Sequence, residues 1–450
     1  MKVFHRVLLV SLSALLVIFS FEPFAIRFVA LFAWVPFLLA IRNTRFRVAF
    51  RLGSLHGMLV FGATLSWTWN IFSTIAPALW FILSLFPALF AALNTRIPKK
   101  WQPVILATTW TGFEFFRGEL FWLHFPWITP GTAVPPCFFT PIVGVYGVSF
   151  LIILAGALLL QNSKAQRIVA ITLLATIWLI PNSSFHAPPV STLKVGLIQN
   201  ESMNYDDYRI ASKNLEAPVD VIVWPEYAIG FDPKRFPTTQ QEIGNLLGGN
   251  TKLLVAGGKT WFDKHGDSFA NTAFTFDHHQ ILGTHTKNRL VHFFAEGKKG
   301  TEAKAIKTPL GRIGTPICFD CDHQDVMRRM MADGAEVFLI PSMDAKHWTA
   351  RQHLQHAQLF RHRAAENARH LAIASTSGLT QIIHANGSTT NTIPQMEEGS
   401  LIGTVGLSDR ETPFQKGGWL VGPSTVIATT IIMIGVLLSF LQKRRVNAKV

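Results

Sequence analysis

Charged residues and cysteines are scarce in this 450-residue chain. Only 15% of the residues are charged and the mean hydropathy is +0.28. That composition is too apolar for a soluble protein and too polar for a membrane helix bundle alone. The chain is also too long for one ordinary domain, so we expect at least two. Three cysteines cannot form a disulfide framework.

Acidic residues are also few, because 27 Asp and Glu face 41 Lys and Arg, which gives a net charge of +14. A surplus of this size invites comparison with nucleic-acid-binding proteins. Many of the basic residues, however, lie between hydrophobic segments, where they set the orientation of membrane helices. We therefore expect no nucleic-acid partner.

Apolar segments concentrate before about residue 182 and after about residue 418, whereas the middle is typical of a globular domain. A spanning helix needs ~20 mostly apolar residues. The first segment follows Lys2 and Arg6 as a signal peptide would, but Phe21-Glu22-Pro23 offers no small-residue cleavage site, so we expect an uncleaved helix. The eight candidate spans are residues 7–21, 24–41, 54–72, 75–93, 103–121, 142–160, 168–181 and 420–441.

Basic residues fall on alternate loops between these spans, and so on one face of the bilayer. By the positive-inside rule that face is cytoplasmic. Residues 182–419 then lie outside, which in the inner membrane of a Gram-negative cell means the periplasm. The basic groups are Lys2 and Arg6; Arg42, Arg45, Arg47 and Arg51; Arg96, Lys99 and Lys100; Lys164 and Arg167; and Lys443, Arg444, Arg445 and Lys449.

The outer loops are rich in aromatic residues, notably at Trp67-Thr68-Trp69 and residues 121–127. Two interpretations stay open, an interfacial aromatic belt and a vestibule that faces lipid. Glu114 and Arg117 are spaced to lie on one helical face. They predict either a local ion pair or a site for a lipid headgroup, because charges near a membrane core are costly.

Strand-like and helix-like segments alternate between residues 190 and 412, which predicts an α/β layered domain. Helices are expected around residues 207–215, 238–247, 323–333 and 351–369. Strands are expected at residues 193–198, 220–223, 253–256, 273–276, 281–286, 313–317, 337–340, 371–375 and 402–405.

Three chemically active residues each follow one of these strand-like runs. Glu226 closes Trp224-Pro225-Glu226, Lys287 opens Lys287-Asn288-Arg289, and Cys318 closes Pro316-Ile317-Cys318. Side chains delivered this way can converge at one edge of a sheet. A free thiol is mostly protonated at neutral pH and becomes an effective nucleophile only beside a base or a positive charge.

These motifs resemble the Glu-Lys-Cys triad of the nitrilase or carbon–nitrogen hydrolase superfamily. The segments Arg363–Arg369 and Ser375–Thr380 are similar to that family's later helix and strand. The attached membrane segments, with Glu114–Arg117 and Phe125-Pro126-Trp127, resemble apolipoprotein N-acyltransferases. The resemblance implies a membrane helical domain at residues 1–182, an α-β-β-α sandwich at 190–412 and a last membrane helix at 418–442.

The resemblance also implies an activity without a cofactor or metal. An acyl chain would pass from a phospholipid to Cys318 and then to the N-terminal amine of a diacylglyceryl-lipoprotein. Glu226 would act as general base, and Lys287 would stabilise the oxyanion. We expect a membrane-embedded monomer.

The shell around the triad departs from the family pattern. Glu296 arrives one residue later than the family's glutamate, and Asp320 replaces the glutamate that usually follows the nucleophile. The family's Asn-Asp-Ala-Trp-Phe loop corresponds to Met343–Trp348. We expect the substrate-binding residues to be Glu296, Asp320, Trp224, Phe319 and Trp348.

These departures keep two other functions open. The protein could be a membrane-anchored amidase or an acyltransferase for another amine. It could also be a catalytically silent scaffold in an envelope or plasmid-transfer complex. We further predict that residues 292–303, with Gly297 and Gly300, form a loop that gates the thiol.

Cysteine and histidine patterns offer two weaker alternatives. Cys318-Phe319-Asp320-Cys321 is a C-x-x-C, but the usual thioredoxin-like context is not evident. The histidines at 347, 353, 356 and 362 suggest a metal, yet no carboxylate or thiol completes a set. We expect them to lie on a solvated helix face instead.

Overall fold

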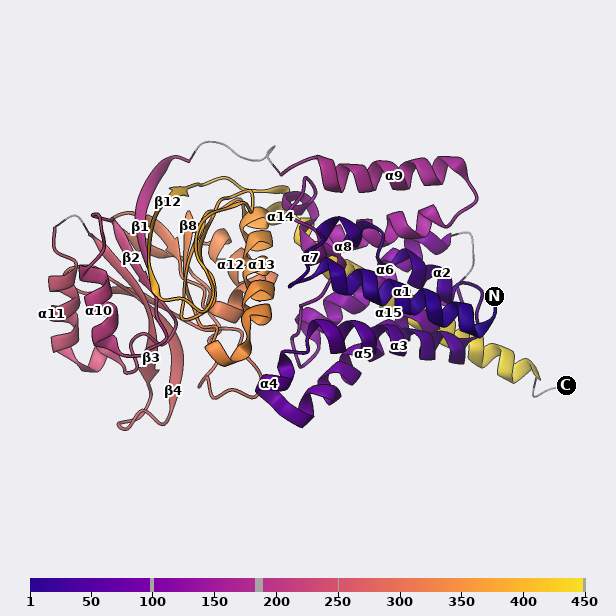
Figure 1. Cartoon of the computed structure of the whole chain (residues 1–450), viewed down its shortest axis with the longest axis horizontal. Coiled ribbons are helices and arrows are strands. Elements are labelled where there is room, and N and C mark those ends of the chain that lie inside the picture. The colour runs from indigo at the N-terminus through magenta and orange to yellow at the C-terminus, as the bar shows by residue number, and fades with distance from the viewer. Residues whose placement is uncertain (98–100, 183–188, 250, 448–450) are drawn as a thin grey trace. The chain divides into compact units, whose positions relative to one another are not determined.

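A computed structural model describes residues 1–97, 101–182, 189–249 and 251–447. It divides the chain into two compact units, one of Met1–Pro181 with Gly417–Val450 and one of Asn182–Lys416. Figure 1 shows helices alone in the first unit and layered strands and helices in the second. Lys99, Lys100 and Lys449, and the side chains of residues 443–445, which we assigned to the cytoplasmic face, lie outside the described parts of the chain.

The helical unit is built from apolar helices, several of which carry proline in the first turn, where its missing N–H costs nothing. Its elements are α1 (Val3–Ser20), η1 (Arg27–Leu31), α2 (Val35–Ile41), α3 (Phe46–Thr64), α4 (Thr68–Phe72), η2 (Ser73–Ile75), α5 (Ala76–Asn94), α6 (Gln102–Phe115), the π-helix η4 (Phe116–Leu120), α7 (Pro130–Ala133), α8 (Thr140–Leu159), α9 (Lys164–Leu179), η8 (Gly418–Leu420) and α15 (Val421–Asn447).

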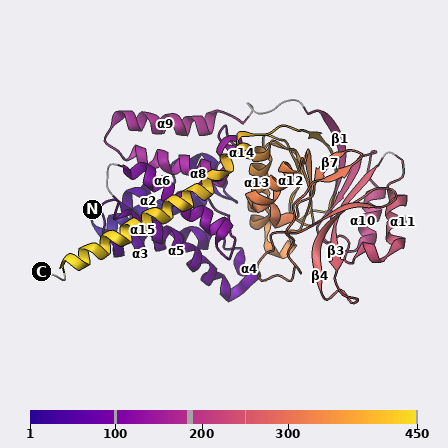
Figure 2. The same ribbon diagram turned by 180° about the vertical axis from the view of Figure 1, so that it is seen from behind.

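Small residues let these helices pack closely. A Cβ on Gly53 of α3 would lie 2.4 Å from the carbonyl oxygen of Pro87 in α5, so only glycine permits this approach. A Cβ on Gly112 of α6 would lie 2.2 Å from Oγ1 of Thr429 in α15. The C-terminal helix therefore packs among the N-terminal helices, and Figure 2 shows it running along the unit.

Four helical segments are long and apolar enough to cross a membrane, judged by length and composition within the described residues: Val3–Ser20, Thr68–Asn94, Thr140–Leu159 and Gly418–Gln442. The other expected spans fall on helices that are shorter or more polar. Residues 24–41 divide into η1 and α2, and α3 begins in the basic sequence around Arg47. The α6 helix passes into a π-helix, and α9 has 16 residues.

The second unit is a four-layer sandwich with the expected α/β composition. One sheet has the order β12-β1-β2-β3-β4-β5 and the other β11-β10-β9-β8-β7-β6. The strands are β1 (Ser191–Gln199), β2 (Val221–Trp224), β3 (Leu253–Trp261), β4 (Phe269–Phe276), β5 (Ile281–Thr286), β6 (Ile306–Thr308), β7 (Gly311–Gly314), β8 (Val337–Ser342), β9 (Leu371–Ser375), β10 (Thr380–Ile383), β11 (Thr389–Ile393) and β12 (Gly399–Leu407).

Helices cover the outer faces of both sheets. They are α10 (Tyr205–Lys213), η5 (Pro233–Arg235) and α11 (Pro237–Leu246) on the first, and η6 (Cys318–Asp322), α12 (Gln324–Ala332), η7 (Lys346–Trp348), α13 (Ala350–Asn367) and α14 (Pro413–Lys416) with the second. Strand β2 shows why the layers form. Val221 and Val223 pack between the two sheets, whereas Ile222 and Trp224 pack against α10 and α11. The predicted α-β-β-α arrangement is thus confirmed.

Candidate active site

The three predicted catalytic residues line one cavity of about 280 Å³ in the α/β unit. Glu226 follows β2, Lys287 follows β5, and Cys318 begins η6 after β7. Glu296 and Trp348 line the same cavity. Strand ends and the loops that follow them therefore bring together five residues spread over more than a hundred positions of the sequence.

Glu226 is held by one of its two carboxylate oxygens. Its Oε1 accepts hydrogen bonds from Lys287 Nζ at 2.9 Å and from Asn271 Nδ2 at 2.5 Å. Its Oε2 is buried and accepts no hydrogen bond within the described part of the chain. Gly257 of β3 makes room for this residue, because a Cβ there would lie 2.4 Å from the Cα of Glu226. One oxygen of the base is thus fixed while the other is available.

Lys287 lies between two carboxylates. Besides Glu226, its ammonium group donates to Oε1 of Glu296, whose Oε2 accepts from the backbone N–H of Val291 at 2.5 Å. An ammonium group has three protons, so one remains for another acceptor. Lys287, Glu226 and Glu296 are all buried. Glu296 therefore reaches the site, although it comes one residue later in the sequence than the family's glutamate.

The charge states follow from burial and from these neighbours. Burial raises the pKa of Glu226, and the nearby Glu296 adds to the effect, although Lys287 opposes it. Burial alone would lower the pKa of Lys287, but the two carboxylates outweigh it and raise that pKa well above its usual value. Burial and the charge of Glu226 raise the pKa of the Cys318 thiol. At neutral pH the thiol of Cys318 is therefore protonated and Lys287 is an ammonium ion.

Cys318 adopts a backbone conformation that is rare for a side-chain-bearing residue, with φ of 46°. Such conformations cluster at functional sites because the surrounding structure must impose them. Its Sγ donates to the carbonyl oxygen of Met343 at 3.5 Å. The sharp turn presents the thiol to the cavity at the start of η6.

Asp320 imposes this turn rather than binding substrate, which corrects our expectation. Its Oδ1 accepts from the backbone N–H groups of Asn288 and Arg289 at 2.9 and 2.7 Å. Its Oδ2 accepts from Ile317 N at 3.1 Å and pairs with His285 Nε2 at 2.9 Å. The carboxylate thus ties the nucleophile turn to the loop that carries Lys287, and no acceptor oxygen is left over for a ligand.

Two other expected substrate-binding residues also lie elsewhere. Trp224 is fully buried in the layer between the sheet and its helices, where its Nε1 donates to Ser212 Oγ at 2.8 Å. Phe319 packs edge-on against His323 and does not line the cavity. We assign both residues to packing.

The cavity wall contains apolar and aromatic residues that the sequence did not single out. Tyr227, next to Glu226, and Phe269 both lie against the ammonium group of Lys259, at 5.6 and 4.8 Å from their ring centroids. Phe294 packs on Trp348. The sequence could have indicated Tyr227, because it is next to Glu226, but it held no comparable indication for the other wall residues. The wall suits an aliphatic chain with a polar end at the triad.

The segment 292–303 carries Glu296 into the site, as predicted, but its backbone is tied at several points. Lys298 N donates to Phe269 O at 2.7 Å, and Gly300 N donates to Lys287 O at 2.8 Å. Gly297 has φ of 80° and pairs with Ala270. Gating by this segment stays a prediction.

Three of the four noted histidines are buried, so the expectation of a solvated helix face was wrong. On α13, His356 pairs with Asp344 at 2.8 Å and with Asp322 at 3.2 Å. His353 bonds to the carbonyl oxygen of Ala345 at 3.0 Å, and His362 is also buried, whereas His347 is exposed. Within the described residues, no group of three or more His, Cys, Asp or Glu side chains could hold a metal ion.

Cys321 has no part in the site. It is fully buried among apolar residues under α12, and burial raises the pKa of its thiol. Both Cys318 and Cys321 are free thiols. The C-x-x-C spacing is therefore incidental in this structure, because one thiol faces the cavity and the other faces the core.

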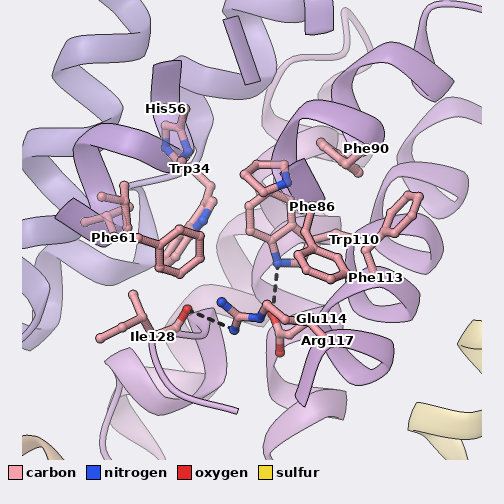
Figure 3. A pocket seen from close by; sticks show the side chains of 14 residues that line it. Trp34, His56, Phe61, Phe86, Phe90, Trp110, Phe113, Glu114, Arg117 and Ile128 are labelled. Atoms are coloured by element: carbon pink, nitrogen blue, oxygen red, sulfur yellow. Dashed lines mark hydrogen bonds between the residues drawn. The ribbon is translucent and has the colours of Figure 1, made fainter. Parts of the chain in front are cut away.

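The helical unit has a cavity of its own, about 40 Å³ in volume, which Figure 3 shows between aromatic side chains. Glu114 and Arg117 lie at one end of it without the expected direct ion pair. Glu114 accepts from Ser149 Oγ at 2.6 Å and Trp110 Nε1 at 2.9 Å. Arg117 donates to the carbonyl oxygen of Trp127 at 2.8 Å. Both charged groups therefore have local hydrogen-bond partners, and binding of a lipid headgroup there stays a prediction.

Comparison with known proteins assigns both units. Residues 13–158 match the apolipoprotein N-acyltransferase N-terminal domain, and residues 189–412 match the carbon–nitrogen hydrolase family. An apolipoprotein N-acyltransferase of Geobacter metallireducens is 26% identical over 94% of each chain. Another from Shewanella oneidensis is 26% identical over 80% of each chain.

Solved structures resemble the α/β unit. An amidase of the nitrilase superfamily from Nesterenkonia is 18% identical, with a TM-score of 0.41, over 51% of this chain and 96% of its own. A carbon–nitrogen hydrolase from Helicobacter pylori is 16% identical, with a TM-score of 0.40, over 48% of this chain and 89% of its own.

Proposed function

The chain belongs to the carbon–nitrogen hydrolase superfamily as an apolipoprotein N-acyltransferase-like membrane protein, and from this membership we propose its reaction. It moves a fatty acyl chain from a phospholipid to Cys318, and then to the N-terminal amine of an apolipoprotein. We propose Glu226, Lys287 and Cys318 as the catalytic residues, with Glu296 and Trp348 beside them in the substrate cavity.

The observation that carries this proposal is the free oxygen of the buried base. Glu226 Oε1 accepts hydrogen bonds from Lys287 and Asn271, while Oε2 is buried and accepts none within the described residues. Its raised pKa makes it a better proton acceptor than an ordinary carboxylate. The protonated thiol of Cys318 needs such a base, because only the thiolate is nucleophilic.

The first half-reaction forms a thioester. Sγ of Cys318 attacks the ester carbonyl carbon of the phospholipid while its proton passes to Glu226. The remaining proton of Lys287 Nζ stabilises the oxyanion of the tetrahedral intermediate. When the intermediate collapses, the C–O ester bond breaks, and Glu226 returns the proton to the departing alkoxide of the lysophospholipid.

In the second half-reaction an amine is the nucleophile and the thiolate of Cys318 is the leaving group. The amine at the apolipoprotein N-terminus attacks the thioester carbonyl, and Glu226 takes a proton from the attacking nitrogen. The C–S bond then breaks, and the thiolate of Cys318 recovers its proton from Glu226. The apolar wall of Tyr227, Phe269 and Phe294 keeps the acyl chain in place and water away between the two steps.

The finer organisation is part of the proposal. We assign residues 1–182 and 418–442 to the membrane and 190–412 to the catalytic domain. The protein lies in the inner membrane as a monomer, with its catalytic domain in the periplasm, where lipoprotein N-termini would be presented.

The decisive experiment measures lipoprotein N-termini by mass spectrometry in cells with and without the gene. A third acyl chain that requires the gene and an intact Cys318 supports the proposal. Modification of another amine, or release of the chain to water, would select a different acyltransferase or an amidase. A wild-type protein that is never acylated by any phospholipid would leave only a scaffold role.

A further inference from the structure

One charged residue of the triad cavity takes no part in the ion pairs around Lys287. Four charged side chains line the cavity, and three of them, Lys287, Glu226 and Glu296, bind one another. The fourth is Lys259 of β3, which is half-buried. Within the described residues, its ammonium group contacts two aromatic rings and no carboxylate. The cavity therefore contains a cation that has no protein anion beside it.

The fold of β3 carries Lys259 to the triad. Side chains alternate between the faces of a strand, and Leu253 of β3 packs between the two sheets. Gly257 continues that face beside Glu226, and Lys259 follows two residues later. Across the β3–β4 pairing, Lys259 lies opposite Asn271, which donates to Glu226 Oε1. Opposite residues share one face, with their Cβ atoms about 5 Å apart, so the side chain of Lys259 starts next to the residue that holds the base.

Two aromatic rings position the ammonium group of Lys259. Its Nζ lies 5.6 Å from the ring centroid of Tyr227 and 4.8 Å from that of Phe269. Both rings also line the cavity. The faces of the rings attract the cation, but they do not replace the oxygen acceptors that its three N–H groups bind. The ammonium group is thus held in the cavity wall, and its donors remain for water or for an anionic ligand.

The charges around the triad decide where a substrate can carry a negative group. The reacting carbonyl must lie at Cys318, in a cavity that Glu226 and Glu296 also line. These carboxylates repel an anion, and Lys287 already donates to both of them. Lys259 is the remaining cation of the cavity lining. A phospholipid matches this arrangement, because its phosphodiester carries a negative charge a few bonds away from its ester carbonyls.

We propose that Lys259 binds the phosphate of the phospholipid acyl donor while the ester carbonyl lies at Cys318, an inference that rests on the function proposed above. The charge-assisted hydrogen bond selects a phospholipid over a neutral glycerolipid with the same acyl chains. Phe294 and Trp348, which pack on each other in the cavity wall, contact the acyl chain. Lys259 thus determines donor specificity, whereas Lys287 stabilises the oxyanion.

Acylation of the full chain in detergent micelles, followed by intact mass spectrometry, tests the role of Lys259. The two donors are a phosphatidylethanolamine and the diacylglycerol with the same acyl chains, which has both esters but no phosphate. We expect the wild-type protein to prefer the phospholipid. Lys259→Met removes the charge but keeps a side chain that packs well on aromatic rings. The ratio of the KM for the phospholipid to the KM for the diacylglycerol should rise at least about tenfold, because a hydrogen bond between charged groups is lost.

Two further variants separate the charge of Lys259 from other effects. Lys264→Met removes an exposed lysine from the turn of the same β3–β4 hairpin, outside the cavity, and should keep the wild-type preference. Lys259→Arg keeps a cation that can lie over the same rings. It should retain most of the preference for the phospholipid, which a loss caused by altered packing would not allow.

The outcomes distinguish the role of Lys259 from the reaction itself. Equal preferences in Lys259→Met and wild type, or equal effects of Lys259→Met and Lys264→Met, would overturn the role of Lys259 and leave the proposed reaction intact. The same conclusion would follow if Lys259→Arg lost the preference as fully as Lys259→Met, or if both lipids acylated the wild-type protein equally well. A wild-type protein acylated by neither lipid would overturn the proposed function, and the role of Lys259 with it.

Discussion

At the scale of single residues, two cysteines three positions apart have opposite surroundings. Cys318 lies in the triad cavity, and Cys321 is sealed in the core. We expect the purified protein mixed with phospholipid to gain one acyl chain that hydroxylamine removes. Cys318→Ala should abolish the adduct and Cys321→Ala should retain it, as intact mass spectrometry can measure. An adduct that persists in Cys318→Ala, or moves to Cys321, would contradict the assignment.

The raised pKa of Glu226 predicts an acid limb in the pH profile. The reaction requires the carboxylate form, so the acylation rate should fall as the pH drops through a midpoint above the usual value for glutamate. Glu226→Gln should slow acylation by ~10²–10⁴-fold and remove that limb. Glu302→Gln, an exposed acidic residue of a neighbouring loop, is the control and should leave rate and profile unchanged. An acid limb that survives in Glu226→Gln would assign the base elsewhere.

Sequence alone could predict the triad because each member has its own local motif after a strand. It could not predict the roles of Asp320 and Trp224. Three of the four hydrogen-bond partners of Asp320 come from residues 285–289, about thirty positions away, and a sequence does not pair them. Trp224 is only two residues before Glu226, but the alternation of β2 turns it to the helix layer.

At the scale of elements, α13 braces the nucleophile turn through a buried charge. His356 pairs with Asp322 of η6 and with Asp344, which follows the carbonyl that accepts from Cys318. Burial alone would lower the pKa of His356, but Asp344 and Asp322 together raise it to about 10. The histidine is therefore cationic at neutral pH, and it links two segments on which the thiol depends.

This pairing predicts a stability effect with a definite pH dependence. Because the folded-state pKa lies above the unfolded value of ~6.5, the contribution is full below that value and is lost as the pH rises towards 10. His356→Gln should destabilise the protein by about 3 kcal/mol near pH 6, as expected when one partner of a buried ion pair is removed. Thermal unfolding in detergent should show the difference from wild type shrinking at high pH, with exposed His347→Gln as the control. A difference that is constant across pH would exclude the charge as its cause.

The elements that escaped prediction share a physical reason. β6 has only three residues, and β11 is an edge strand of largely exposed polar residues, Thr389–Ile393, so neither shows a hydrophobic pattern. The histidines of α13 read as a polar face because their partners, Asp322, Asp344 and Ala345, lie on other elements. The hydrophobic periodicity of a sequence does not predict buried polar pairs between different elements.

At the scale of the whole molecule, the sequence inserts the α/β unit between α9 and α15 of the helical unit. The composition changes near residues 182 and 418, and this change predicted the insertion. Helices that contact lipid need apolar surfaces, whereas a domain in water needs polar ones, so the two units differ in composition. The number of full spans was harder to predict. Hydropathy does not distinguish a spanning helix from one divided by a 3₁₀ turn, such as residues 27–41.

The distribution of basic residues predicts the orientation of the whole chain. The α2–α3 loop carries Arg42 and Arg45, whereas the acidic residues of the helical unit lie in other loops and helices. By the positive-inside rule the basic loops stay in the cytoplasm and the α/β unit lies in the periplasm. A fusion at position 300 should therefore activate alkaline phosphatase, and a fusion at position 45 should activate only a cytoplasmic reporter. The opposite pattern would place Cys318 in the cytoplasm, away from exported lipoproteins, and would remove the proposed acceptor together with the topology.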